Sequence, residues 1–302
     1  MSSDKVNVNN IPEEEYILPG TRACAGCSLS IAYRFALKAL GKNTIVTVPA
    51  SCSTVLHGMY PVSAVRIPML NTAFETTGAS ASGIRAALNV LGKKNITVLG
   101  WAGDGGTADI GIQALSGAAE RNTDMIYACY DNEFYSNTGG QRSSSTPFGA
   151  FTTTTPKGKR KRRKNMPAIM AAHGIPYVAT ASSSFPLDLY EKFKKAKEQY
   201  KGDTRYIHIQ APCAPGHGFD TSKTIKIGRL AVETGIWTLY EIINGKFILS
   251  PESEKIVSNK KKRKPVSEYY KTQKRFRFMT DEDIRQVQKD IDLLYEDYKK
   301  FL

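Results

Sequence analysis

The chain is poor in cysteine and has no long apolar run. Only five of its 302 residues are cysteine, which is too few for the disulfide framework of a small secreted protein. No apolar stretch reaches the roughly 18 residues that a membrane-spanning helix needs, so we expect no membrane contact. Residues 1–15 are polar and lack the apolar core of a signal peptide, which predicts a cytoplasmic protein.

No nucleic-acid-binding pattern accompanies the strong positive charge. The formal net charge is +14, and two basic runs carry much of it, KGKRKRRK at residues 157–164 and KKKRK at 260–264. A protein that binds DNA or RNA should carry a zinc-finger, RNP or basic-zipper pattern, and the sequence has none. We therefore interpret the runs either as solvated loops or as a docking surface for an acidic protein or another subunit.

Apolar segments with strand and helix periodicity alternate along most of the chain. We expect strands at residues 44–48, 65–70, 96–102, 125–130, 177–180 and 205–210, and helices at 28–40, 75–91, 108–119, 167–173, 187–199 and 281–301. This alternation predicts an α/β fold with a mostly parallel sheet. The region after residue 250 is rich in charge and has irregularly spaced aromatics. We expect residues 1–249 to form the domain and residues 250–302 an extension that packs on a partner subunit.

Two polar segments follow neighbouring strands of this pattern. Residues 103–106 (GDGG) come directly after one apolar run, and Asp131 and Asn132 come at the end of the next. The carboxyl ends of parallel strands face the same crevice, where such folds bind ligands. A carboxylate and an amide oxygen beside Gly-rich backbone suit Mg²⁺ that carries a phosphate ligand, because Mg²⁺ prefers hard oxygen ligands.

Four of the five cysteines lie where a parallel sheet would bring them to the same crevice. Cys24 and Cys27 begin an expected helix, and Cys52 and Cys213 each follow a strand end. Four thiolates there would bind Zn²⁺ or a [4Fe–4S] cluster, and one CxxC pair with two distant single cysteines favours the cluster. Taken alone, the CxxC pair also fits a redox-active thiol pair or two buried small residues. Cys129 lies inside an apolar strand, and we expect it in the core.

Residues 132–165 and two of the four histidines also lie close to these segments. Residues 132–165 are polar and rich in Gly, Ser and Thr, and structureless loops of this length inside compact domains are usually functional. His57 and His217 each lie within five residues of one of the four cysteines. We interpret them as hydrogen-bonded loop histidines, with a proton relay or a substrate contact as the alternative. His173 and His208 are expected to be structural.

Taken together, these segments resemble the β subunits of the 2-oxoacid:ferredoxin oxidoreductases, and those of pyruvate:ferredoxin oxidoreductase in particular. The resemblance covers nearly the whole chain and rests on CAGC at 24–27, Cys52, GDGG at 103–106, DNEFYSNTGGQ at 131–141 and APC at 211–213. It implies a thiamine diphosphate-binding fold, which is a doubly wound, mostly parallel α/β sheet with helices on both faces. It also implies an enzyme subunit that oxidises pyruvate to acetyl-CoA and CO₂ and passes the electrons through a cluster to ferredoxin.

The resemblance also implies roles for individual residues. The implied Mg²⁺ ligands are Asp104, the Asn132 side chain and the Phe134 carbonyl. Thiamine diphosphate would approach the backbone of Gly103, Gly105 and Gly106 closely. Asn137, a catalytic candidate, would lie near its thiazolium ring and the substrate. The implied ligands of the [4Fe–4S] cluster are Cys24, Cys27, Cys52 and Cys213.

Other components of the reaction are implied to come from partners. In this family the α subunit supplies the glutamate that activates the aminopyrimidine ring, so we expect the chain alone to be inactive. Further subunits of the complex would include a ferredoxin-like δ subunit or domain, and CoA would be the acyl acceptor if the substrate is pyruvate. Residues 27–28, 53–60 and 71–77 depart from the pyruvate-type pattern. They leave oxalate, oxidised to CO₂ without CoA, and bulkier 2-oxoacids as alternative substrates.

Overall fold

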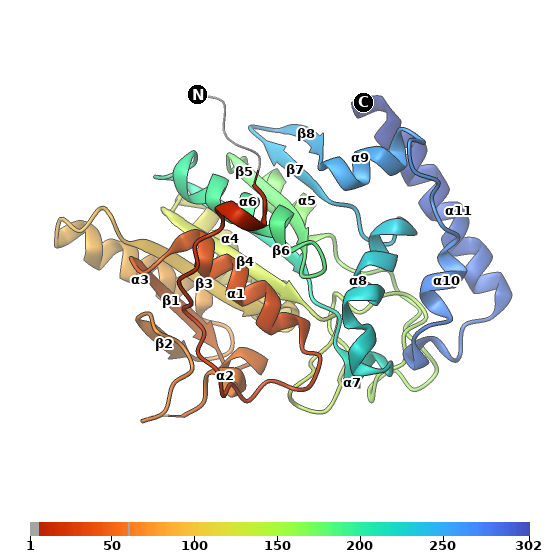
Figure 1. The fold of residues 1–302 in the computed structure, drawn as a ribbon, viewed down its shortest axis with the longest axis horizontal. Helices are drawn as coiled ribbons and strands as arrows, with labels where there is room; N and C mark the ends of the chain where they lie inside the picture. Colours follow the sequence, from red (N-terminus) through yellow and green to blue (C-terminus); the bar gives the residue numbers. More distant parts are fainter. Residues whose placement is uncertain (1–5, 60) are drawn as a thin grey trace.

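An eight-stranded sheet forms the centre of the computed structural model, which describes residues 6–59 and 61–302 (Figure 1). The strand order is β2-β1-β3-β4-β6-β5-β7-β8. The strands are β1 (Thr44–Pro49), β2 (Met69–Thr72), β3 (Thr97–Gly103), β4 (Met125–Asp131), β5 (Tyr177–Ser182), β6 (Thr204–Gln210), β7 (Tyr240–Ile243) and β8 (Lys246–Leu249). Neighbours from β2 to β5 are parallel, and β7 and β8 are antiparallel to their neighbours. The predicted mostly parallel sheet is confirmed.

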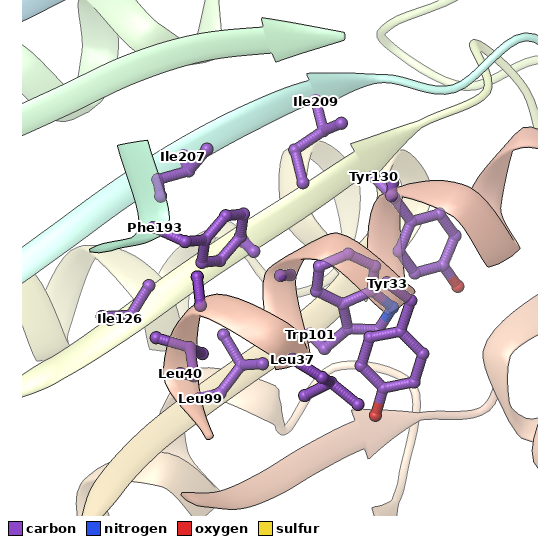
Figure 2. Packing of buried hydrophobic residues seen from close by; sticks show 14 of the residues in the cluster. Tyr33, Leu37, Leu40, Leu99, Trp101, Ile126, Tyr130, Phe193, Ile207 and Ile209 are labelled. Carbon is purple, nitrogen blue, oxygen red and sulfur yellow. The ribbon is translucent and has the colours of Figure 1, made fainter. Parts of the chain in front are cut away.

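Helices cover both faces of this sheet, because successive strand residues point to opposite sides. On one face, α1 (Ser28–Leu40) and α6 (Pro186–Glu198) pack on the central strands, and Figure 2 shows Tyr33, Trp101 and Phe193 meeting there. The fully buried Trp101 stacks on Tyr33 with 4.5 Å between ring centroids. On the other face, a second buried cluster lies under α3 (Thr77–Val90), α4 (Ile112–Glu120) and α5 (Met166–Ala172). The sheet is therefore doubly wound, as expected.

Two elements differ from the pattern that the sequence predicted. The strand expected at residues 65–70 is found at Met69–Thr72, because Pro68 has no N–H for the ladder. Val65 instead forms an isolated antiparallel bridge with Ile17. The helix expected at 108–119 is α4, which follows a π-helical turn, η2 (Gly105–Asp109). Residues 1–5, which belong to the polar N-terminus, lie outside the described residues. Tyr60, the last residue of the departing segment 53–60, also lies outside them.

The last third of the chain contains elements that the sequence pattern did not predict. The hairpin of β7 and β8 turns through Asn244 and Gly245, whose φ angles of 49° and 79° suit a tight turn. Beside it lie three helices that were also not expected, α8 (Thr224–Glu233), α9 (Pro251–Val257) and α10 (Val266–Tyr270), together with α11 (Asp281–Tyr298), which confirms the helix expected at 281–301 (Figure 1). Tyr240, Tyr269 and Tyr295 of these elements belong to one buried cluster. The inner side of residues 250–302 thus packs on this chain, and contact with a partner subunit stays a prediction.

Short helices complete the chain and bring two cysteines to the edge of the sheet. They are η1 (Val8–Asn10), α2 (Cys52–His57), α7 (Ala214–His217), η3 (Thr221–Lys223), η4 (Lys274–Phe276) and η5 (Lys299–Phe301). Because α2 follows β1 and α7 follows β6, Cys52 and Cys213 lie at the carboxyl edge of the sheet. Among the helices of the described residues, none is both long and apolar enough to span a membrane.

Candidate functional site

The site lies where four adjacent parallel strands end. β1, β3, β4 and β6 are neighbours in the sheet, so the residues that follow them meet at one edge. A cavity of about 570 Å³ opens there. Its lining contains most of the predicted site residues, namely Cys24, Cys27, Cys52, Asn132, Phe134, Asn137 and Cys213.

The Asn132 side-chain amide lies between the Phe134 carbonyl and the Asp104 carboxylate at this sheet edge. In one orientation of its amide, the Asn132 oxygen lies 2.6 Å from the Phe134 carbonyl oxygen and 3.3 Å from Asp104 Oδ1. In the other orientation, the amide nitrogen donates hydrogen bonds to both of these oxygens. Because the first orientation places three oxygens together without a proton between them, a cation among them would remove their repulsion. The donor set of one carboxylate, one amide and one carbonyl fits Mg²⁺.

Neighbouring groups give the two carboxylates at this edge different pKa values. Burial and the charge of Asp131 hold the pKa of Asp104 well above its usual value, and Ser143 Oγ donates a hydrogen bond to it. Burial alone would also raise the pKa of Asp131, but the hydrogen bond of 2.8 Å with His208 Nε2 lowers it. Asp131 also accepts a 2.8 Å hydrogen bond from the Glu133 backbone N–H. Asp131 therefore orders the turn, whereas Asp104 is the carboxylate available to a cation.

The three glycines of residues 103–106 differ in how much space surrounds them. A Cβ atom on Gly105 would lie 1.8 Å from the Tyr135 ring, which allows no side chain at this position. Tyr135 is itself fixed by a 2.6 Å hydrogen bond from its hydroxyl to Asp109. Cβ atoms on Gly103 and Gly106 would meet their nearest neighbours at 3.3 Å, which is tight but less severe. Gly105 is thus required by the packing of the π-helical turn on the loop after β4.

The four predicted cluster cysteines line the same cavity as free thiols. Burial raises the pKa of Cys27, Cys52 and Cys213, in the last case to about 12. Across the described part of the chain, no three His, Cys, Asp or Glu side chains are arranged to hold a single metal ion. The four thiols therefore share a cavity without forming a closed single-ion site. Cys129 is fully buried in β4, which confirms its expected place in the core.

The remaining predicted residues have distinct positions around the cavity. Asn137 is exposed and lines the cavity, as a residue in contact with substrate would. His217 also lines it, and its Nε2 lies 2.8 Å from the Asn132 carbonyl oxygen. His57 is buried beside Tyr33, with 5.4 Å between ring centroids, and does not line the cavity. His208 joins Asp131 to the Tyr206 hydroxyl, in agreement with its expected structural role.

The basic run at residues 157–164 makes several contacts within the chain, while Lys157, Arg160, Lys161 and Arg162 are exposed, as the solvated-loop interpretation expects. Lys159 is buried, and its Nζ donates to the carbonyls of Thr146 at 2.5 Å and Ser144 at 2.9 Å. Burial lowers the pKa of this lysine to about 8. Intramolecular partners are also found for Arg160, Arg162, Arg163 and Lys164.

Sequence reasoning missed several residues that support the site, namely Glu133, Ser143, Lys159, Arg163 and Arg275. Glu133 and Ser143 lie in the polar segment whose function was anticipated, and hydroxyl and carboxyl groups there were the available signal. Lys159 and Arg163 were attributed to a basic run because composition does not distinguish buried from exposed cations. Arg275 lies 142 residues after Glu133, its ion-pair partner at 2.5 Å, and no local pattern marks such a contact.

Comparisons with known proteins agree with this arrangement. Residues 50–209 match the family described as thiamine pyrophosphate enzyme, C-terminal TPP binding domain. The chain is 51% identical over 294 residues to pyruvate synthase subunit PorB of Methanothermobacter thermautotrophicus, which covers 96% of this chain and 99% of that protein. It is 48% identical over 300 residues to ketoisovalerate oxidoreductase subunit VorB of Pyrococcus furiosus, with 96% and 94% covered.

A solved structure supports the fold. A chain of 2-oxoglutarate:ferredoxin oxidoreductase from Magnetococcus marinus superimposes with a TM-score of 0.58 at 22% sequence identity. The match covers 76% of this chain and 84% of that one. At this identity the likeness concerns the architecture alone.

Proposed function

Because this chain belongs to the β subunits of the thiamine diphosphate-dependent 2-oxoacid:ferredoxin oxidoreductases, we propose that it is the catalytic β subunit of an enzyme that oxidises pyruvate to acetyl-CoA and CO₂. The observation that carries this proposal is the meeting of two donor sets at one sheet edge. Asp104, Asn132 and the Phe134 carbonyl provide hard oxygens, and four thiols line the adjoining cavity.

The oxygen donors fit the diphosphate end of the cofactor. Asp104, the Asn132 side chain and the Phe134 carbonyl would hold Mg²⁺, which in turn binds phosphate oxygens. The absence of a side chain at Gly105 keeps the π-helical turn and the Tyr135 loop in contact beside this position. When bound, thiamine diphosphate supplies the nucleophile and electron sink that 2-oxoacid decarboxylation requires. Asn137, exposed at the cavity, is placed to contact the substrate.

The sulfur donors fit a [4Fe–4S] cluster held by Cys24, Cys27, Cys52 and Cys213. Burial keeps three of these thiols protonated at neutral pH. Cluster binding would therefore release protons, because thiolates are the ligands. Such a cluster accepts electrons singly, which suits transfer to ferredoxin through a ferredoxin-like δ subunit or domain.

The lack of a free carboxylate in the described lining of the cavity supports a dependence on the α subunit. Among the residues that line the cavity, Glu133 is the only carboxylate, and it is engaged by two arginines. No free carboxylate is therefore left in the described lining to activate the aminopyrimidine ring. We infer that this group comes from the partner, and that residues 250–302 contribute their outer side to the complex.

A second substrate class is favoured by the comparison with VorB. Its 48% identity is close to the 51% shared with PorB, so a branched 2-oxoacid is the alternative substrate. Oxalate oxidation, which would need no CoA, is the third candidate, and the departures at residues 27–28, 53–60 and 71–77 motivate its inclusion.

Anaerobic reduction of a dye or ferredoxin by the whole complex tests the proposal. We expect reduction with pyruvate that depends on CoA. In the separately purified chain, which is free of the clusters of other subunits, we expect about four irons with matching acid-labile sulfide. Faster reduction with 2-oxoisovalerate would assign the VorB-type activity, and CoA-independent reduction with oxalate would assign the third. The isolated chain should be inactive with every substrate, and turnover by it would overturn the dependence on a partner.

A further inference from the structure

Glu133 has an unusual backbone between two of the proposed cation ligands. Its φ angle is 69°, in the left-handed region that residues with a side chain rarely adopt. The residue lies directly between Asn132 and Phe134, so its conformation decides where the Asn132 amide and the Phe134 carbonyl point. The backbone N–H of Glu133 donates to Asp131 Oδ1 at 2.8 Å, and its carbonyl accepts from Thr146 Oγ1 at 2.6 Å.

Two arginines from distant segments hold the side chain of this residue. Arg275 Nη2 lies 2.5 Å from Glu133 Oε2, and both side chains are only 3% exposed. Arg163 Nη1 lies 3.2 Å from the other carboxylate oxygen. Arg163 belongs to the basic run, and Arg275 belongs to the C-terminal segment. Both oxygens of one buried carboxylate are thus engaged by cations from two segments that are distant in the sequence.

Arg275 and Arg163 each make further contacts that hold their guanidinium groups in place. Arg275 donates to Gln273 Oε1 and to the Tyr269 hydroxyl, each at 3.1 Å. Arg163 donates to the Ile236 carbonyl at 3.0 Å and lies 5.0 Å from the Trp237 ring centroid. These contacts anchor both arginines in the buried cluster of the last third of the chain.

His217 lies between Arg275 and the same turn. Arg275 Nη1 lies 3.0 Å from His217 Nε2, which in turn lies 2.8 Å from the Asn132 carbonyl oxygen. This one ring nitrogen can either accept from Arg275 or donate to the Asn132 carbonyl, so His217 packs between them and the direct link of Arg275 to the turn is its ion pair with Glu133. Arg275 also lines the cavity.

We infer that Arg275 and Arg163 are positioning residues that hold Glu133 in its left-handed turn and thereby aim the Asn132 and Phe134 oxygens at the cation. The inference rests on the proposed function, because it takes these oxygens as ligands of the Mg²⁺–thiamine diphosphate complex. It makes part of the C-terminal segment a component of the cofactor site. Partners that orient metal ligands commonly change metal affinity by about 10–100-fold when they are mutated.

The test uses the assembled complex, freed of thiamine diphosphate and Mg²⁺ and kept anaerobic. Binding of thiamine diphosphate is followed by calorimetry as Mg²⁺ is raised, and turnover is measured in parallel. In R275M we expect the Mg²⁺ concentration for half-saturation to rise by about tenfold or more. At saturating Mg²⁺, kcat should stay within about twofold of the unmodified complex. R275K keeps the positive charge but lacks the planar guanidinium donors. Its Mg²⁺ requirement should lie between those of R275M and the unmodified complex.

Matched variants separate this role from general destabilisation. R285M removes an arginine that pairs, within the described residues, only with its exposed helix neighbour Glu282, and its Mg²⁺ curve should match that of the unmodified complex. E133Q keeps the shape of the side chain and should raise the Mg²⁺ requirement as R275M does. If R275M does not fold, the Mg²⁺ curves of E133Q and R163M test the inference instead.

D104N distinguishes failure of this inference from failure of the proposed function. Loss of binding in D104N together with unchanged Mg²⁺ curves in R275M and E133Q would overturn the positioning role alone. A fall in kcat at saturating Mg²⁺ with an unchanged curve would also overturn it, because Arg275 would then act elsewhere in the cavity. Normal Mg²⁺-dependent binding in D104N would overturn the cation site itself.

Discussion

At the scale of single residues, identical functional groups have different roles because their neighbours differ. Asp104 and Asp131 are both buried at the same sheet edge. The pKa of Asp131 is lowered despite its burial by the hydrogen bond with His208, whereas burial and Asp131 raise the pKa of Asp104. Glu133 is the third buried carboxylate of the site, and it forms ion pairs with two arginines. Of these three carboxylates, Asp104 alone has no lysine, arginine or histidine partner in the described structure, which is what a carboxylate reserved for a metal ion requires.

His57 should make the stability of the chain depend on pH. Burial lowers its pKa from 6.5 to about 4, and neither ring nitrogen has a hydrogen-bond partner. The unfolded chain therefore binds a proton between pH 6.5 and 4 that the folded chain does not, so stability falls as the pH falls through this window. The loss is at most about 1.4 kcal/mol per pH unit.

Substitution of this residue checks the prediction. H57F removes the titrating group at similar volume. We expect urea unfolding at pH 7.5 and pH 5 to show a smaller loss of free energy of unfolding for H57F than for the unmodified chain. Equal losses for the two chains would contradict the assignment of this window to His57.

At the scale of elements, the π-helical turn depends on a glycine that has no room for a side chain. G105A would force its methyl group into the Tyr135 ring, and such overpacking typically costs about 1–3 kcal/mol. We expect this variant to unfold at lower urea concentration and to bind thiamine diphosphate more weakly. Gly83 in α3 is the matched control, because its Cβ would meet nothing within 4 Å.

The control should move in the opposite direction. Alanine in an exposed helix interior is about 0.5–1 kcal/mol more stable than glycine, so G83A should unfold at higher urea concentration. Urea denaturation of both variants is the measurement. If G105A were as stable as the unmodified chain, the turn would be more adaptable than its packing indicates.

The elements that the sequence predicted well are those whose apolar residues repeat regularly. Leu29, Tyr33, Leu37 and Leu40 gave α1 its bounds, and all four are buried. The hairpin of β7 and β8 was missed although Asn244-Gly245 is a common turn dipeptide, because its short strands are only partly buried. Within the site, the sequence could place only those residues that directly follow the end of a strand, as for Asp104 and Asn132. The Arg275 contact depends on the fold of the last third of the chain.

At the scale of the whole molecule, the surface available to an acidic partner is smaller than the composition indicates. Within residues 157–164, the cations without an ion pair or hydrogen bond in the described structure are Lys157 and Lys161, and both are exposed. We expect K157E/K161E to raise the apparent KM for ferredoxin and to flatten its dependence on salt, because opposite charges steer association and salt screens them.

K93E/K94E is a control with the same change in net charge. Lys93 and Lys94 are exposed just before β3 begins, which places them at the opposite edge of the sheet from the cavity. Their reversal should leave the KM for ferredoxin unchanged. Equal KM values and salt slopes for the two double variants would argue against docking at this loop.

The ion pairs between the basic run and α11 also couple cofactor binding to local unfolding in which α11 detaches. Arg160 and Arg162 pair with Asp283 and Asp290 of α11, each at 2.9 Å, and Arg275 lies in the segment just before that helix. A ligand that binds only when this loop is ordered lowers the population of conformers in which α11 is detached. Amide hydrogen exchange in α11 should therefore slow when thiamine diphosphate and Mg²⁺ bind, although the helix touches neither. The C-terminal helix would then report occupancy of the site from the outer surface of the molecule.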